Sequence, residues 1–168
     1  MTIALVITFS GADRAGIVDA ISTCIAAHEG NWEQSRSVRL AGYFAGVILA
    51  TVPSDRTDAL SGDLRAIEGI SIDIARGDSA ASGADKLYTL ELVGTDQPGI
   101  VRQISRVLVS HGANIHELET NTESAPMDGG MIFRAMARLS CPEGLEIAKL
   151  TRELEKLADD LMVELSFE

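Results

Sequence analysis

The sequence predicts an α+β protein built from two βαββαβ domains, and three observations support that prediction. The stretch from Gly11 to Val18 recurs as the stretch from Gly94 to Val101. Each copy stands between a strand-like apolar run and a run with helical spacing. The same order of six elements is found around both copies. Two domains of about 80 residues each also suit a chain of 168 residues.

A constant offset of 83 positions relates the two copies, since 94−11, 96−13 and 99−16 are equal. Without a gap, nine of the 21 positions from 11 to 31 are identical 83 residues later. Unrelated residues would match at roughly one position in twenty. The repeat is therefore an internal duplication, and it also relates His28 to His111 and Asn31 to Asn114.

The first half of the chain shows the order βαββαβ. Apolar alternation and apolar runs predict its strands, and apolar residues at helical spacing predict its helices. The run after the first helix is polar and rich in serine, which suits an edge strand. The predicted strands cover residues 3–9, 32–39, 43–52 and 70–75, and the predicted helices cover residues 17–28 and 54–67.

The second half repeats this order after a small, polar segment at residues 79–85, which we interpret as a linker. The predicted domains are therefore residues 1–78 and 86–168. One difference is a longer hairpin loop, residues 122–129. The predicted strands cover residues 88–92, 114–121, 130–139 and 161–167, and the predicted helices cover residues 100–111 and 147–157.

A βαββαβ unit of this size folds most simply as a ferredoxin-like sandwich, a four-stranded antiparallel sheet with two helices on one face. The other face of the first sheet carries Ala4 and Val6. An apolar open face on so small a unit is normally covered by a neighbour. We therefore expect such units to pair, side by side or face to face, within the chain or between chains.

Composition limits the classes of partner. The net charge of −11 and the pI near 4.6 argue against direct binding to nucleic acid. No apolar run resembles a signal peptide or approaches the length of a membrane span. Cys24 and Cys141 lack the spacing of a metal site or a redox pair. We expect a cytoplasmic protein that does not bind membranes.

Catalytic signatures are missing from the sequence. Gly16 is not followed by Lys-Ser/Thr, so the glycine-rich turn is no Walker loop. A serine elbow and a zinc-binding helix pattern are also missing. His111, His116, Glu117 and Glu119 could form a metal site, but the two histidines straddle a predicted helix end. We predict no enzymatic activity, no metal and no cofactor.

The motif Gly-x-Asp-Arg/Gln-x-Gly-Ile-Val at the first strand–helix turn of a βαββαβ unit resembles that of ACT domains. Two such domains cover nearly the whole chain, as in the glycine cleavage transcriptional repressors. Ser35-Arg36 in the edge strand and the long hairpin 122–129 also resemble that subfamily. Ala15 departs from the motif, which usually has proline there.

The resemblance implies a site for an amino acid where the turn of one domain meets a neighbouring domain. The ligand would contact main-chain groups of the turn, a polar residue in it, and an asparagine at the start of the second strand. Glycines let a ligand approach the amides, and a helix N-terminus attracts a carboxylate. The implied ligand-binding residues are Asp13, Gly16, Ile17 and Asn31, with Asp96, Gly99, Ile100 and Asn114 in the second copy.

Simpler interpretations of the same residues remain open. Asp13 and Asp96 could only cap their helices. Asn31 and Asn114 could be ordinary turn residues.

The resemblance further implies a regulator that responds to an amino acid such as glycine or serine. It would modulate transcription of glycine cleavage or one-carbon genes through a protein partner, a transcription factor or a metabolic enzyme, as a homodimer. Two alternatives are a ligand-independent interaction or oligomerisation module and an allosteric partner of an amino-acid metabolic enzyme.

Overall fold

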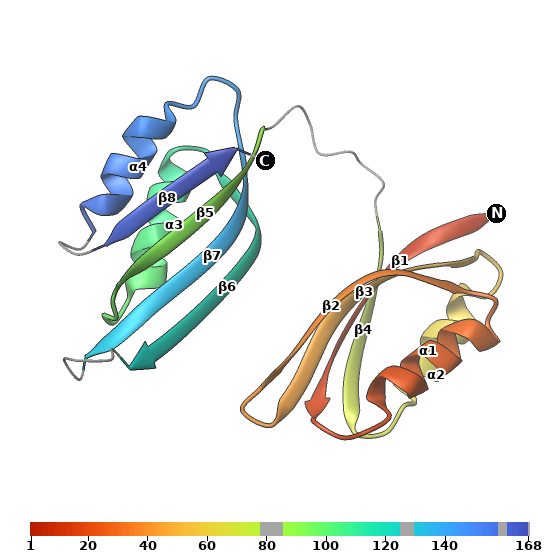
Figure 1. Cartoon of the computed structure of the whole chain (residues 1–168). Coiled ribbons are helices and arrows are strands. Elements are labelled where there is room, and N and C mark those ends of the chain that lie inside the picture. The colour runs from red at the N-terminus through yellow and green to blue at the C-terminus, as the bar shows by residue number, and fades with distance from the viewer. Residues whose placement is uncertain (78–85, 125–129, 158–160, 168) are drawn as a thin grey trace. The chain divides into compact units, whose positions relative to one another are not determined.

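Figure 1 shows the computed structural model of the chain, which describes residues 1–77, 86–124, 130–157 and 161–167. The chain divides into two compact units, Met1–Ala81 and Ser82–Glu168, which we call domain 1 and domain 2. Segment 79–85, interpreted above as a linker, lies outside the described residues, as does most of the predicted loop 122–129.

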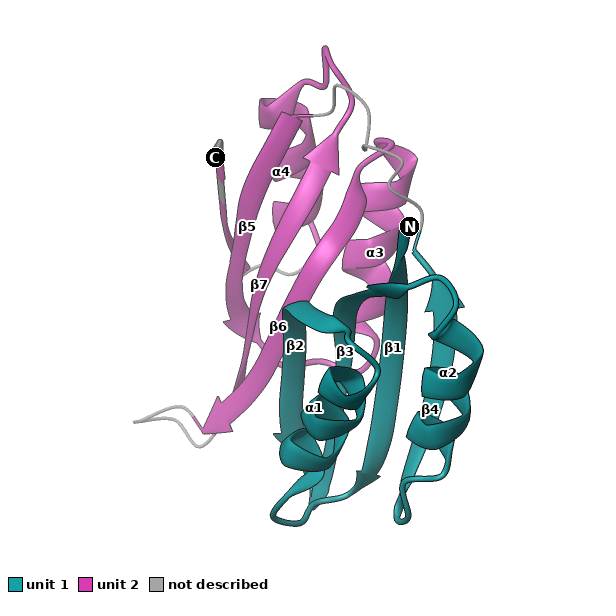
Figure 2. Ribbon diagram, turned by 90° about the vertical axis from the view of Figure 1, so that its right-hand side faces the viewer, with its two compact units in different colours: residues 1–81 teal, residues 82–168 magenta. Residues whose placement is uncertain are grey.

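Domain 1 is a four-stranded antiparallel sheet with the strand order β2-β3-β1-β4. Both of its helices lie on the same face of that sheet, as Figure 2 shows. The elements are β1 (Thr2–Ala12), α1 (Ile17–Ala27), β2 (Asn31–Leu40), β3 (Tyr43–Pro53), α2 (Thr57–Arg65) and β4 (Ile70–Arg76).

Domain 2 repeats this topology with the strand order β6-β7-β5-β8. The predicted fold class, α+β with two ferredoxin-like domains, is therefore confirmed. The elements are β5 (Lys86–Thr95), α3 (Ile100–Ser110), β6 (Asn114–Ser124), β7 (Met131–Cys141), α4 (Ile147–Glu155) and β8 (Met162–Phe167).

Each domain buries its own aliphatic core between the sheet and the helices. In domain 1, Ile7 on β1 lies opposite Ile48 on β3 and is fully buried. The corresponding pair in domain 2 is Leu90 and Ala137. The edge strand β2 of domain 1 and its equivalent β6 in domain 2 carry a register shift at the same place. Glu33 and His116 have no paired residue there.

A histidine–carboxylate pair joins the two helices in both domains. His28 Nε2 lies 2.8 Å from Asp63 Oδ2, and His111 Nε2 lies 2.9 Å from Glu153 Oε2. Each histidine caps the C-terminus of the first helix, and each acid belongs to the second helix. The hydrogen bond from His111 lowers the pKa of the Glu153 carboxyl.

The chain turns from α1 into β2 through a strained residue. Glu29 has φ 59°, the left-handed conformation, whereas the equivalent residue of domain 2 is Gly112 with φ 71°. A residue with a β-carbon pays roughly 1–2 kcal/mol for this conformation. Domain 1 therefore carries a strain at this position that glycine avoids in domain 2.

We expect Glu29→Gly to raise the free energy of unfolding of domain 1 by about 0.5–1 kcal/mol, since relief of strain exceeds the entropy cost of glycine. The exposed ion pair of Glu29 with Arg56, 3.4 Å long, contributes little. Urea unfolding measures the difference. Glu29→Gln is the control, because it removes the charge and keeps the strain. Equal stability of the two variants would contradict the prediction.

Candidate functional site

The two strand–helix turns share one backbone geometry. Each helix begins after a glycine in the left-handed conformation, Gly16 with φ 91° and Gly99 with φ 87°. A β-carbon at either glycine would meet no atom within 4 Å. The backbone angle, and not crowding, therefore requires glycine here, and the space beside each helix start is open.

Neither helix start is capped by a side chain. The interpretation of Asp13 and Asp96 as N-caps is therefore wrong for both domains. The N-cap position belongs to the glycine three residues later, which has no side chain to offer. The first amides of a helix have no carbonyl partner within it, so both turns carry a partial positive charge. In domain 2 the first of these amides, that of Ile100, already donates to the carbonyl of Gln97 at 3.2 Å.

A backbone hydrogen bond holds each turn against the connection between the second and third strands of its domain. The amide of Asp13 donates to the carbonyl of Gly42 in the β2–β3 hairpin, at 2.8 Å. The amide of Asp96 donates at the same distance to the carbonyl of Met131 at the start of β7. Both aspartates are thereby held between the hairpin and the helix start.

The variable fourth residue of the motif forms a second anchor. Arg14 Nη2 donates to the carbonyl of Glu68, at 2.7 Å. Gln97 Nε2 donates to the carbonyl of Leu157, at 3.3 Å. Both acceptors follow the second helix of their domain. Arginine and glutamine share a long side chain with a terminal N–H donor, which explains why either serves, and the sequence alone did not indicate this role.

The two turns differ in whether the aspartate carboxylate has a cationic partner. Asp13 Oδ2 lies 2.6 Å from Arg39 Nε, so its carboxylate already has a cationic partner. In domain 2 the equivalent of Arg39 is Thr122, 83 positions later. Asp96 is exposed, and its carboxylate makes no hydrogen bond or ion pair within the described part of the chain. Only the second turn presents an unneutralised carboxylate.

The two asparagines also differ: the side chain of Asn31 has a hydrogen-bond partner in its own domain, and that of Asn114 does not. Asn31 Nδ2 donates to Glu33 Oε1 at 2.9 Å, and Thr51 Oγ1 donates to the same oxygen at 2.8 Å. In domain 2 the residue equivalent to Glu33 is His116. The side-chain amide of Asn114 accordingly has no hydrogen-bond partner among the described residues.

A third difference lies in the first turn of the helix. Domain 1 has Asp19 there, and domain 2 has Arg102 at the equivalent position. A carboxylate near a helix N-terminus competes with an anionic ligand, whereas an arginine supports one. The surroundings of α3 therefore favour an anion more than those of α1.

One domain alone cannot bring its aspartate and its asparagine to the same small ligand. Tyr43 pairs with Ala12, next to Asp13, and Thr51 pairs with Asn31. These pairs are eight residues apart along β3, since 51−43 is 8, which is about 26 Å at 3.3 Å per residue. A site that uses both residue types needs the asparagine of another domain.

The hydrogen bonds around Glu33 predict a pH effect. Donation by Asn31 and by Thr51 lowers the pKa of the Glu33 carboxyl. Because the folded pKa lies below the unfolded one, this group stabilises domain 1 above about pH 4.5, and the contribution is lost as the pH falls through the lowered pKa. We expect a carbon-detected NMR titration to place the Glu33 pKa below 4.5, and Asn31→Ala to raise it. An unchanged pKa in a variant that lacks both Asn31 and Thr51 donors would contradict this.

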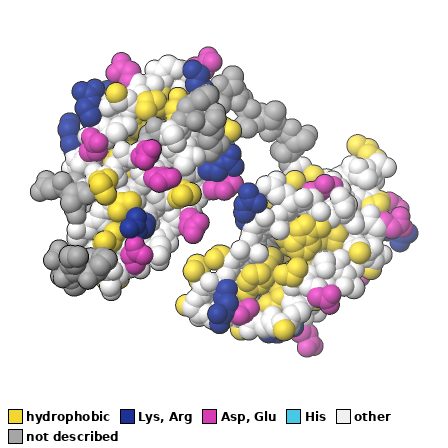
Figure 3. All heavy atoms as spheres, in the orientation of Figure 1, with side chains coloured by type: hydrophobic (Ala, Val, Ile, Leu, Met, Phe, Trp, Pro, Cys, Tyr) yellow, Lys and Arg dark blue, Asp and Glu magenta, His cyan; other side chains and the backbone are white. Residues whose placement is uncertain are grey.

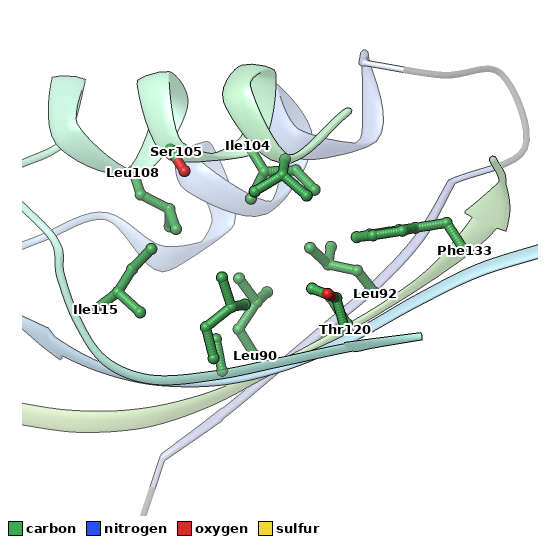
Figure 4. Close-up of a pocket in the computed structure, with 12 residues that line it drawn as sticks. Leu90, Leu92, Ile104, Ser105, Leu108, Ile115, Thr120 and Phe133 are labelled. Carbon is green, nitrogen blue, oxygen red and sulfur yellow. The ribbon is translucent and has the colours of Figure 1, made fainter. Parts of the chain in front are cut away.

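An apolar cavity lies between α3 and the sheet of domain 2, and Figure 4 shows side chains from both directed into it. Its volume is about 10 Å³, close to the least that a single water needs. Ala137 in its wall stands where domain 1 has Ile48, which accounts for the unfilled space. The cavity is too small for an amino acid and is a packing defect of the second core. Its lining includes Leu90, Leu92, Ile104, Leu108, Ile115 and Phe133.

Some classes of site are missing from the described residues. Within ranges 1–77, 86–124, 130–157 and 161–167, no group of three or more His, Cys, Asp or Glu side chains could hold a metal ion. In the same ranges no helix has the length and apolarity to cross a membrane.

The topology and the glycine-bounded turns define a class of tandem βαββαβ proteins. The ACT domain family matches residues 4–72 and 89–168, and the chain belongs to that family. No curated protein matches the sequence significantly.

Two solved structures resemble the whole chain. A protein of unknown function from Galdieria sulphuraria is 31% identical with a TM-score of 0.89, over 100% of this chain and 99% of that one. A candidate glycine cleavage system transcriptional repressor is 18% identical with a TM-score of 0.65, over 100% and 98%. The second likeness shows the shared fold. Both extend over the two domains together.

Proposed function

We propose that this chain is an amino-acid-responsive regulator whose ligand binds at the strand–helix turn of domain 2. The ligand's carboxylate accepts hydrogen bonds from the amides of Val101 and Arg102 in the first turn of α3, since the amide of Ile100 already donates to the carbonyl of Gln97. Its ammonium group pairs with Asp96. The observation that supports this choice is the carboxylate of Asp96, which has no partner in the described chain, whereas that of Asp13 is held by Arg39.

The proposed ligand is a small amino acid, glycine or serine. The open space at Gly99 leaves room for the main-chain groups of a ligand, and the apolar cavity behind the start of α3, at about 10 Å³, is too small for a large side chain. An asparagine of a second copy of the chain, Asn114 or Asn31, would complete the site. The glycine cleavage repressor among the structural relatives is consistent with this ligand class.

The regulatory output passes through a protein partner. A net charge of −11 disfavours direct contact with DNA, since phosphate backbones attract clustered Lys and Arg. The partner is a transcription factor or an enzyme of amino-acid metabolism, acting in the cytoplasm. Ligand binding would alter the surface that this partner recognises.

Isothermal titration calorimetry of the full chain against glycine, serine and leucine tests the proposal. We expect one site per chain for glycine or serine, weaker binding of leucine, and a rise in the melting temperature of domain 2. Absence of heat at millimolar concentrations of all three amino acids, with unchanged melting, would refute it.

A second candidate function is a ligand-independent interaction module. The engaged side chains of Asp13 and Asn31 favour it for domain 1, because both are satisfied without a ligand. This function predicts that a protein partner captured from cell extract is retained equally with and without glycine or serine.

A further inference from the structure

The two helices of domain 2 carry an excess of positive charge. α3 and α4 pack side by side, joined by the pair of His111 and Glu153. Residues 100–110 and 147–156 contain five basic and two acidic side chains, a net charge of +3. The whole of domain 2, residues 86–168, has 8 basic and 14 acidic residues, a net charge of −6. The rest of the domain therefore has a charge of −9. The five basic residues, which we call the basic helix surface, are Arg102, Arg106, Lys149, Arg152 and Lys156.

The basic helix surface lies on the solvent side of both helices. α3 and α4 each bury a stripe of aliphatic side chains against the sheet. The five basic residues lie outside those stripes, and all of them are exposed. Arg102 and Arg106 are about one turn apart on α3, and Val109 continues the same side of that helix. Val109 is 73% exposed, so an aliphatic group in water adjoins the cations.

The chain itself leaves much of this charge unneutralised. The guanidinium groups of Arg102 and Arg106 make no hydrogen bond or ion pair within the described part of the chain. Like charges one turn apart destabilise a helix, and α3 contains no acidic residue to offset them. On α4, the Glu153 carboxylate lies near Lys149 and Lys156, but it is already paired with His111. The cations of the helix surface therefore remain available to a partner.

The sheet face of domain 2 shows a different arrangement of charge. Figure 3 shows acidic and basic side chains spread over these strands. Arg134 lies 2.6 Å from Glu123, and Arg138 lies 3.4 Å from Glu117. The basic side chains of the sheet are thus matched by acidic ones, whereas the arginines of α3 are not.

The helices of domain 1 carry none of these cations at the equivalent positions. The offset is 83 in the first helix, and it is 90 in the second, where Glu153 corresponds to Asp63, since 153−63 is 90. Residues 17–27 and 57–66 contain one basic and three acidic side chains, a net charge of −2. The fold therefore does not require a basic helix layer, and Val109 is replaced by Ala26. The equivalents of the five basic residues are Asp19, Thr23, Ala59, Gly62 and Ala66.

The chemistry of this surface limits the kind of partner. Cations around an exposed aliphatic side chain match a protein helix that carries acidic side chains beside apolar ones. Complementary charge steers such a partner toward the surface and fixes its orientation. A phosphate backbone would be repelled by the charge of −9 on the rest of the domain, and it offers no apolar side chain to cover Val109.

We infer that the basic helix surface docks an acidic amphipathic helix of the protein partner, whose apolar side covers Val109. The inference rests on the proposed function, because that function requires a protein partner. Arg102 belongs both to this surface and to the surroundings of the proposed ligand. A carboxylate bound there would change the charge that the partner meets.

Fluorescence anisotropy of the full chain with a labelled peptide tests the inference in the absence of any amino acid. The probe is a peptide of about sixteen residues with leucines on one side and glutamates on the other, since shorter peptides are marginal helices. Arg106→Glu combined with Lys149→Glu should weaken binding at least about tenfold, because it reverses two of the attracting charges. Val109→Ser should weaken binding about fivefold through the lost apolar contact. The affinity of the wild type should fall as salt is added.

Arg56→Glu combined with Arg65→Glu is the matched control, because it lowers the net charge by the same amount at α2 of domain 1. It should leave the affinity for the peptide within about twofold of the wild type, and circular dichroism verifies the folding of all variants. No binding at millimolar peptide, equal losses in the two double variants, or tighter binding of a DNA duplex than of the peptide would each overturn the inference. Failure of glycine and serine to bind would refute the proposed ligand and leave the peptide result unchanged.

Discussion

Asp96→Asn is expected to weaken the binding of glycine or serine by about tenfold to a hundredfold. A hydrogen bond to a charged group contributes about 1.5–3 kcal/mol, and each 1.4 kcal/mol corresponds to a factor of ten in affinity. The substitution keeps the size of the side chain and removes the charge that would pair with the ligand's ammonium. Calorimetry on the full chain measures the change.

The fold should tolerate this substitution. Asp96 is exposed, its carboxylate has no partner in the described chain, and its anchoring amide is unaffected. The melting temperature of domain 2 without ligand should therefore stay within about 1 °C of the wild type, because changes at exposed positions rarely exceed 0.5 kcal/mol.

Asp13→Asn is the matched control for that experiment. It removes the ion pair with Arg39, an exposed contact that contributes no more than about 1 kcal/mol. Affinity for the amino acid should remain that of the wild type. An equal loss of affinity in both variants would place binding in both turns, and a loss in Asp13→Asn alone would place it in domain 1.

The order of elements was predictable because each one carries a strong local pattern. Leu5, Ile7 and Phe9 alternate in β1, and Ile17, Ile21 and Ile25 recur at helical spacing in α1. The observed elements agree with these predictions because the buried face of each element is set by residues close in the chain. The topology then follows from the few ways in which a βαββαβ unit can cover its sheet.

The interactions of the candidate side chains were harder to predict. Asp13 looked like a helix cap because aspartate is common at that position, and the left-handed glycine that displaces it depends on backbone geometry. Its ion pair with Arg39 joins residues 26 positions apart, since 39−13 is 26, through the β2–β3 hairpin. Such contacts depend on the hairpin register, which no local pattern specifies.

The differences between the copies, in contrast, are readable from the sequence once the offset is known. An offset of 83 pairs Asp19 with Arg102 and Arg39 with Thr122. Each change makes the second turn more suited to a ligand with both a carboxylate and an ammonium group. In the first copy, Asp13 and Asn31 instead have partners within their own domain.

Ile7→Ala is expected to have the largest effect on stability, a loss of about 2–5 kcal/mol from domain 1. Ile7 is fully buried at the centre of the sheet, between Ile48 on β3 and Ile74 on β4. A domain of about 80 residues has only roughly 4–12 kcal/mol of stability to lose. The melting temperature of domain 1 should therefore fall by at least about 10 °C.

The matched substitution in domain 2 is Leu90→Ala, at the equivalent position and equally buried. Because the two cores are separate clusters, each variant should lower one calorimetric transition and leave the other in place. Amide hydrogen exchange would assign each transition to its domain. A shift of both transitions by either variant would instead show that the domains unfold as one unit. In that case binding at the second turn would stabilise domain 1 as well, and the rise in melting temperature caused by glycine or serine would extend to both domains.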